Sequence, residues 1–245
     1  MRLKLFVYVL TAFLVSGCAA TSPHNPFKIP QADIQAKVKT IALVPIDIAP
    51  EIENPAAIKF KFESLLTTKL QDGGFNVIAS DEYATIWRQA VKNLGAVYDS
   101  ATGKRDEKKF SAAFEYTVGE LRAKTKADAL LLSAIVTVKA DFSSNLAEWH
   151  GASDYVRPEG VWGTFSGPQA YGTIAALSLW VDLVDVQGTE MYVNFGGIQV
   201  ISKLYPGMKV IDVPRHEFFA DETKNVRSVN IAINPLIGQR SPPSH

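Results

Sequence analysis

The chain is poor in cysteine, in surplus charge of either sign and in long apolar runs. Its 245 residues contain one cysteine, so no disulfide can form within a monomer. Lys and Arg number 25 and Asp and Glu number 25, which leaves none of the basic surplus that nucleic-acid-binding proteins carry. No run reaches the roughly 20 apolar residues of a membrane-spanning helix, which argues against a polytopic membrane protein. With 47% hydrophobic and 20% charged residues, the composition is that of a folded domain with one sizeable core.

Signatures of catalysis are also missing. The sequence has no Gly-x-Ser-x-Gly, no phosphate loop with Gly-Lys-Ser or Gly-Lys-Thr, and no His-Glu-x-x-His. The four histidines are isolated in the sequence, at His24, His150, His216 and His245. His150 has Glu148 and Asp154 nearby, but a histidine in a polar loop is the more economical interpretation. We therefore expect no enzyme, no cofactor and no metal site, with a hydrolase that uses His150 as a minor alternative.

The N-terminal segment has the three parts of an export signal. Arg2 and Lys4 form a positive region, Leu5 to Val15 is apolar, and small residues follow at Ser16 and Gly17. The apolar part, about 11 residues long, is too short to span a bilayer. Residues 1–17 are therefore predicted to be a signal peptide that is removed from the mature protein.

The residues Val15-Ser16-Gly17-Cys18 resemble the lipobox of bacterial lipoproteins. This resemblance implies lipidation of Cys18, with a diacylglycerol thioether and a palmitate-like N-terminal acyl group, because stable anchoring takes at least two chains. Ala19 stands where a retention signal for the inner membrane has Asp, so the resemblance implies the outer membrane, with the protein facing the periplasm. An ordinary secretory signal, cleaved at a small residue such as Ser16 or near Ala19-Ala20, is the alternative.

A polar stretch with three prolines follows the cysteine. Pro23, Pro26 and Pro30 punctuate it, and this composition predicts that residues 18–37 form a lipidated N-terminus and an extended, flexible tether. The folded domain is then expected over residues 38–238, and residues 239–245 are expected to be a loose tail.

Hydrophobic periodicity predicts the elements of that domain. We expect strands at 40–46, 75–79 and 128–142, and a long antiparallel pair that turns near Gln187-Gly188. The apolar face of this pair is expected to consist of Leu177, Leu179, Val181 and Leu183 on the first strand and Met191, Val193 and Phe195 on the returning strand. We expect helices that begin at Asn54 and Ser80, a third ending near Lys126, and a last amphipathic helix from Val226 to about Ile237. Gly196-Gly197 predicts a bulge or bend in the returning strand. This order predicts a single α/β (α+β) domain, with helices packed on a mixed, mostly antiparallel sheet.

Several of these segments resemble the α/β domain of CsgG-like, LpoB-like and TolB N-terminal-like bacterial envelope proteins, many of which are lipoproteins. The resemblance rests on the strand Lys39 to Ile46, the helix Ala56 to Gln71, the "G-F-x-V" strand in Gly74 to Ser80 and the "A-D-x-L-L" strand in Ala127 to Ile135. Such a domain serves secretion channels and synthase activators alike, so it does not by itself define a function.

Residues 143–173 are expected to be a long loop rich in aromatic residues and glycine. Aromatic side chains separated by glycines suit a contact surface for a partner, and their alternative role is a lid that enlarges the core. Possible contact residues are Trp149, His150, Tyr155, Trp162, Phe165 and Tyr171. Two carboxylates, Asp182 and Asp185, lie on opposite faces of a strand, and we interpret both as solvent-facing or turn residues.

Together these features predict a non-enzymatic lipoprotein that binds or assembles another component of the bacterial cell envelope. Its expected partners are the lipid bilayer, through acylated Cys18, and another envelope protein or a second copy of the chain, and not nucleic acid. An oligomeric export-channel or structural subunit resembling CsgG is the alternative, although Pro158, Pro168 and the many glycines interrupt the alternation that a barrel strand needs.

Overall fold

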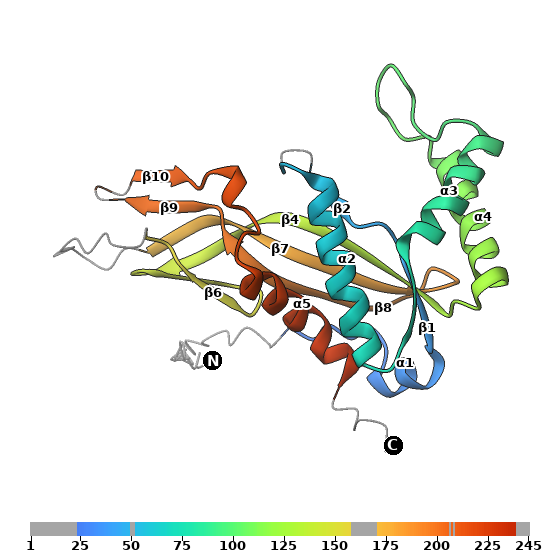
Figure 1. Ribbon diagram of the computed structural model, residues 1–245, viewed down its shortest axis with the longest axis horizontal. Helices are drawn as coiled ribbons and strands as arrows, with labels where there is room; N and C mark the ends of the chain where they lie inside the picture. Colours follow the sequence, from blue (N-terminus) through green and yellow to red (C-terminus); the bar gives the residue numbers. More distant parts are fainter. Residues whose placement is uncertain (1–23, 50–51, 158–170, 206, 208, 239–245) are drawn as a thin grey trace, which may run out of the picture.

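Three long antiparallel strands form the spine of the protein. The computed structural model describes residues 24–49, 52–157, 171–205, 207 and 209–238 (Figure 1). Strand β4 (Ala129–Ser143) pairs with β7 (Tyr171–Asp185) along its whole length, with Ala129 opposite Asp185 and Ser143 opposite Tyr171. Strand β8 (Glu190–Val200) pairs with the other edge of β7. The turn between β7 and β8 lies at Gln187-Gly188, as predicted.

Short parallel strands extend the sheet at the beginning of β4. Strands β1 (Thr40–Leu43) and β2 (Asp47–Ile48) each pair in parallel with β4, and β3 (Asn76–Ile78) pairs in parallel with β1. The sheet is therefore mixed, with more antiparallel than parallel length, and it carries helices as the sequence predicted.

Helices cover both faces of the sheet near the beginning of β4. Helices α2 (Pro55–Asp72) and α5 (Glu222–Ile237) pack on one face, against residues such as Leu131 and Leu179. Helices α3 (Ser80–Leu94) and α4 (Glu107–Thr125) pack on the opposite face, against Leu130 and Val184. Burial on both faces explains why β4 opens as a continuous apolar run rather than an alternation.

The segment from His24 to Lys37 is folded, in contrast to the extended tether predicted for residues 18–37. Pro26 and Lys28 form backbone hydrogen bonds with Val193 and Met191 on β8, and the Phe27 ring packs edge-on against Tyr192 at 5.2 Å. Helix α1 (Gln31–Lys37) follows, and its Ile34 is fully buried in the main core. The prolines suggested a tether, but burial of Ile34 and partial burial of Phe27 against the main core, which composition does not reveal, hold this segment in place.

The first part of residues 143–173 is a β-hairpin rather than a loop. Strands β5 (Leu146–Trp149) and β6 (Ala152–Tyr155) pair with each other, and β5 pairs with the end of β4. The hairpin returns to β8, where the Gly197 N–H donates to the His150 carbonyl. A second core fills the enclosed space, with Phe142, Trp149, Ile174 and Leu204 among its members. Residues 158–170, which include Trp162 and Phe165, lie outside the described residues.

Two adjacent glycines allow β8 to approach its neighbours on both sides. A Cβ on Gly196 would lie 1.9 Å from the Ser228 carbonyl oxygen of α5, and a Cβ on Gly197 would lie 2.5 Å from the Ala152 side chain. The pairing of β7 with β8 shifts register beside Gly197, which confirms the predicted bulge. The glycine pair therefore serves close packing as well as bending.

Helix α5 contains a proline, and the sheet compensates for it. Pro235 has no N–H for the Ile231 carbonyl one turn earlier. Asn194 of β8 donates from Nδ2 to the carbonyls of Ile231 and Ala232, at 3.1 and 3.2 Å, and the Tyr192 hydroxyl donates to Ala232 at 2.6 Å. These buried side chains satisfy the carbonyls of α5 and fix the helix on β8.

Some smaller elements differ from the sequence prediction. A two-stranded sheet of β9 (Ser202–Tyr205) and β10 (Lys209–Asp212) and a 3₁₀ helix η2 (Arg215–Glu217) precede α5, and the sequence interpretation named none of them. Asn54 precedes α2 in a left-handed conformation without a side-chain cap, and Ser80 donates its hydroxyl to Glu63 instead of capping α3. Within the described residues, no helix combines the length and the apolar character needed to cross a membrane.

Candidate functional site

Among the described residues, no helix packs on the middle of one sheet face, and the β5–β6 hairpin reaches this region only at its tip, where His150 stacks on Phe195. Helices α3 and α4 cover this face at the beginning of β4, and the β5–β6 hairpin covers it at the end. Between them, neighbouring positions of β4, β7 and β8 form rows across the sheet. We call this surface the central face, and it consists of Ala134, Val136, Trp180, Asp182, Val193 and Phe195. Four of these side chains are half-buried and belong to none of the core clusters of the described residues, namely Val136, Trp180, Val193 and Phe195.

Asp182 is the carboxylate of the central face. It lies between Leu132 and Val193 on the neighbouring strands. Its Oδ1 atom is buried and has no hydrogen-bond partner among the described residues. Burial raises the pKa of Asp182 to about 6; Glu190 also raises it, and Lys28 opposes the shift. The sequence interpretation expected Asp182 to be solvent-facing or part of a turn; it lies within β7 and is half-buried, whereas Asp185 accepts hydrogen bonds from the turn, at Gln187 and Thr189.

His150 borders the central face at the tip of the β5–β6 hairpin. Its ring stacks on Phe195 with 4.4 Å between ring centroids and 23° between planes, and its Nδ1 atom lies 2.8 Å from Ser178 Oγ. Burial, with a smaller contribution from His24, lowers the pKa of His150 and favours the neutral ring. Ser178 is fully buried in β7, so this pair presents no hydroxyl nucleophile to solvent.

The other predicted contact residues divide into a buried and an exposed group. Trp149 is only 7% exposed and donates from Nε1 to the Leu177 carbonyl at 3.2 Å, so it belongs to the second core and not to a contact surface. Tyr155 and Tyr171 are 68% and 82% exposed and lie in one row at the far end of the sheet. Trp162, Phe165 and the predicted lipidation site Cys18 lie outside the described residues.

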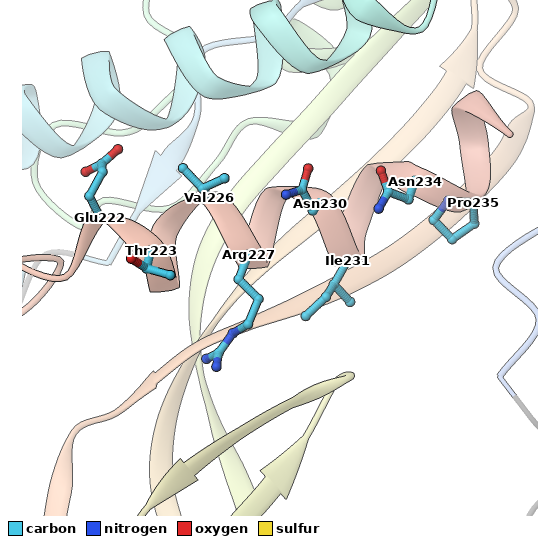
Figure 2. A pocket seen from close by; sticks show the side chains of 8 residues that line it. All are labelled: Glu222, Thr223, Val226, Arg227, Asn230, Ile231, Asn234 and Pro235. Carbon is cyan, nitrogen blue, oxygen red and sulfur yellow. The ribbon is translucent and has the colours of Figure 1, made fainter. Parts of the chain in front are cut away.

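A groove of about 640 Å³ follows the outer side of α5 (Figure 2). Two charged residues line it: Glu222 forms an ion pair with Lys61 at 3.0 Å, and Arg227 points toward the β5–β6 hairpin and donates to the carbonyls of Ser153 on β6 and Ile198 on β8 at 3.1 and 3.0 Å. Beside Arg227, Lys224 forms an ion pair with Asp154 at 2.7 Å. Arg227 and Lys224 are thus engaged in holding the hairpin against α5. Within the part of the chain that the structure describes, no group of three His, Cys, Asp or Glu residues is arranged to hold a metal ion.

One sequence pattern, in strand β7, indicated that the central face is more than a solvent-exposed surface. In β7 the predicted core residues Leu177, Leu179, Val181 and Leu183 alternate with Ser178, Trp180 and Asp182. A tryptophan on the otherwise polar side of a strand is unusual for a surface exposed only to water. For β8 the alternation was misleading, because Tyr192 and Asn194 face α5 while Val193 and Phe195 lie on the central face.

Comparison with known proteins adds little to this geometry. No protein-family model matches the chain, and no curated protein matches it. Among solved structures, lipoprotein GNA1162 from Neisseria meningitidis is similar over 65% of this chain and 81% of that chain, with 15% sequence identity and a TM-score of 0.32. A similarity at this level carries no inference about function.

Proposed function

We propose that the protein is a lipid-anchored, non-enzymatic component of the bacterial cell envelope that binds a partner protein through its central face. The observation that carries the proposal is the central face itself, where the half-buried Trp180 belongs to no core cluster and Asp182 Oδ1 has no hydrogen-bond partner among the described residues. Half-buried aromatic side chains beside polar groups are typical of protein interfaces. The anchor is inferred from the lipobox-like residues that end at Cys18.

The position of the folded N-terminal segment supports a partner close to the membrane. Only five residues separate Cys18 from His24, and they span at most about 20 Å when fully extended. Pro26 forms its backbone hydrogen bond with Val193, a residue of the central face. An anchor on Cys18 therefore holds the central face near the lipid surface, in contrast to the long reach of a 20-residue tether.

The anchor is tested by metabolic labelling. We expect cells fed an alkyne analogue of palmitate to label the natural protein and the Thr21→Ala variant, which keeps the cysteine. The Cys18→Ala variant should lose the label, because it has no sulfur to carry the lipid. Equal labelling of all three proteins would contradict the anchor.

The binding role is tested by site-specific photo-crosslinking in intact cells. A photoreactive phenylalanine analogue at Trp180 should yield a crosslinked protein that mass spectrometry identifies. The matched control is the same analogue at Phe60, an exposed aromatic position on α2 that is 77% exposed. The proposal requires a partner at Trp180 that is absent at Phe60. Failure to recover any protein at Trp180 above the Phe60 background would overturn it.

A further inference from the structure

Asp182 lies in an environment that does not compensate its charge. Its neighbours across the strands are apolar, Leu132 on one side and Val193 on the other. One oxygen of the carboxylate is shielded from water and accepts no hydrogen bond from the described residues. A half-buried carboxylate without donors is unfavourable, and the free protein responds by holding the proton more tightly.

Lys28, the cation near Asp182, already forms an ion pair with another carboxylate. Lys28 and Glu190 are the charged groups that act on Asp182, and they form an ion pair with each other at 3.7 Å. Their effects on the pKa of Asp182 are opposed, and the pKa remains raised. Asp182, Glu190 and Lys28 together carry two carboxylates and one ammonium group. When all three are ionised, this part of the surface has a net negative charge.

We propose that the central face docks a protein segment that presents a Lys or Arg side chain to Asp182. This inference rests on the proposed function and names the chemistry of the partner. The cation would donate to Asp182, and its alkyl stem would lie on the apolar side chains around it. Trp180 occupies the neighbouring row on the same strand, where its ring suits a cation–π contact with an approaching guanidinium or ammonium group.

The shape of the surface favours a protein over a small amine. The central face consists of cross-strand rows of an extended sheet, and small ligands instead need concave sites that enclose most of their surface. The half-buried side chains Val136, Trp180, Val193 and Phe195 offer apolar area on three adjacent strands. This spread matches the core of a protein interface better than a single headgroup.

The test compares Asp182→Asn with Asp141→Asn in the full-length, anchored protein. Asn has nearly the shape of Asp but no charge, and Asp141 is an exposed carboxylate of β4 outside the central face. Both variants carry the photoreactive residue at Trp180. We expect Asp182→Asn to reduce the yield of crosslinked partner at least tenfold and Asp141→Asn to leave it unchanged. The crosslinked peptide of the partner should contain Lys or Arg.

A stability measurement separates lost binding from lost folding. Because the charge of Asp182 is uncompensated in the free protein, the Asp182→Asn variant should unfold at the same temperature as the natural protein at pH 7.5, or higher. An undiminished crosslink in Asp182→Asn, a crosslinked peptide without Lys or Arg, or adducts with lipid alone would each overturn the inference. If Trp180 captures a protein in spite of Asp182→Asn, the proposed binding role stands and only the basic segment is wrong.

Discussion

At the scale of single residues, Asp182 makes the stability of the protein depend on pH. Its pKa is near 3.8 in an unfolded chain and about 6 in the fold, so between these values the folded state binds the proton more tightly. The stabilising contribution of this group is therefore complete below pH 4 and is lost as the pH rises through 6. We expect Asp182→Asn to match the natural protein at pH 4 and to exceed it at pH 7.5 by about 1 kcal/mol after allowance for solvent screening.

Thermal unfolding at the two pH values measures this difference. For a domain of this size, 1 kcal/mol corresponds to roughly 2–4 °C in Tm. Asp141→Asn serves as the control, and its difference from the natural protein should not change with pH in the same way. A pH-independent effect of Asp182→Asn would show that folding does not raise the pKa of this carboxyl, and a natural protein that is more stable than the variant at pH 7.5 would show that the carboxylate is paired in solution.

A second prediction at this scale concerns Gly196. Its Cβ would lie 1.9 Å from a backbone carbonyl oxygen of α5, and neither β8 nor α5 has a flexible side chain there that can move away. We expect Gly196→Ala to lower the free energy of unfolding by about 1–3 kcal/mol or more through overpacking. Gly119→Ala is the matched control, because Gly119 is an exposed residue of α4 with no atom within 4 Å of an added Cβ. That control should gain roughly 0.5–1 kcal/mol from helix propensity, and urea unfolding compares the two variants.

At the scale of elements, the contact of β8 with α5 is predicted to be cooperative. Asn194→Ala removes the donor for the Ile231 carbonyl and should cost about 1–3 kcal/mol. In a Pro235→Ala background the helix can donate its own N–H to that carbonyl, so the same substitution should cost less. A double-mutant cycle measured by urea unfolding should yield a coupling free energy of about 1 kcal/mol between the two positions. Additive effects would mean that Asn194 does not compensate for the proline.

The elements also show how far sequence patterns reach in this protein. Helices α2 to α5 and strands β4, β7 and β8 follow from periodicity, because each has a long apolar stripe. The β5–β6 hairpin does not, since its four-residue strands are too short to show a periodicity, and its buried residues Trp149 and Ala152 pack against Gly197 on a distant strand. The face assignment of β8 failed for a similar reason, because Asn194 is buried to serve the carbonyls of a helix 37 residues later.

The sequence predicted only one residue at the border of the candidate site and none of the residues at its centre. His150 was named as a possible contact, and the structure places it beside Phe195 at the border of the central face. Trp180 and Asp182 were not grouped with it, because they come together through strand pairing across β4, β7 and β8 rather than through spacing in the sequence. A single strand pattern does not tell whether its second face is covered by a helix, by a hairpin or by nothing.

At the scale of the whole molecule, the folded segment from His24 to Lys37 makes a prediction about truncation. A chain that begins at His24 should unfold at the same urea concentration as one that begins at Cys18. A chain that begins at Val38 loses the buried Ile34 and the Phe27 contact with Tyr192, and we expect it to lose at least 2 kcal/mol of stability or to fail to fold. Equal midpoints for all three chains would show that this segment contributes no stability and behaves as a tether.

If Cys18 carries the proposed lipid, the pairing of Pro26 to Lys28 with β8 limits how far the protein can reach from its anchor. Strands β4 and β7 each contain 15 residues and are therefore about 50 Å long, whereas the five residues between Cys18 and His24 can span at most about 20 Å. A lipid on Cys18 would then act as a pivot, and the length of the folded domain, more than that of the linker, would set how far from the anchor a partner can be bound. The anchored domain would then bind partners only within a small area of the membrane and in a narrow range of orientations. A longer linker would enlarge this area but would leave the orientation of the domain less defined.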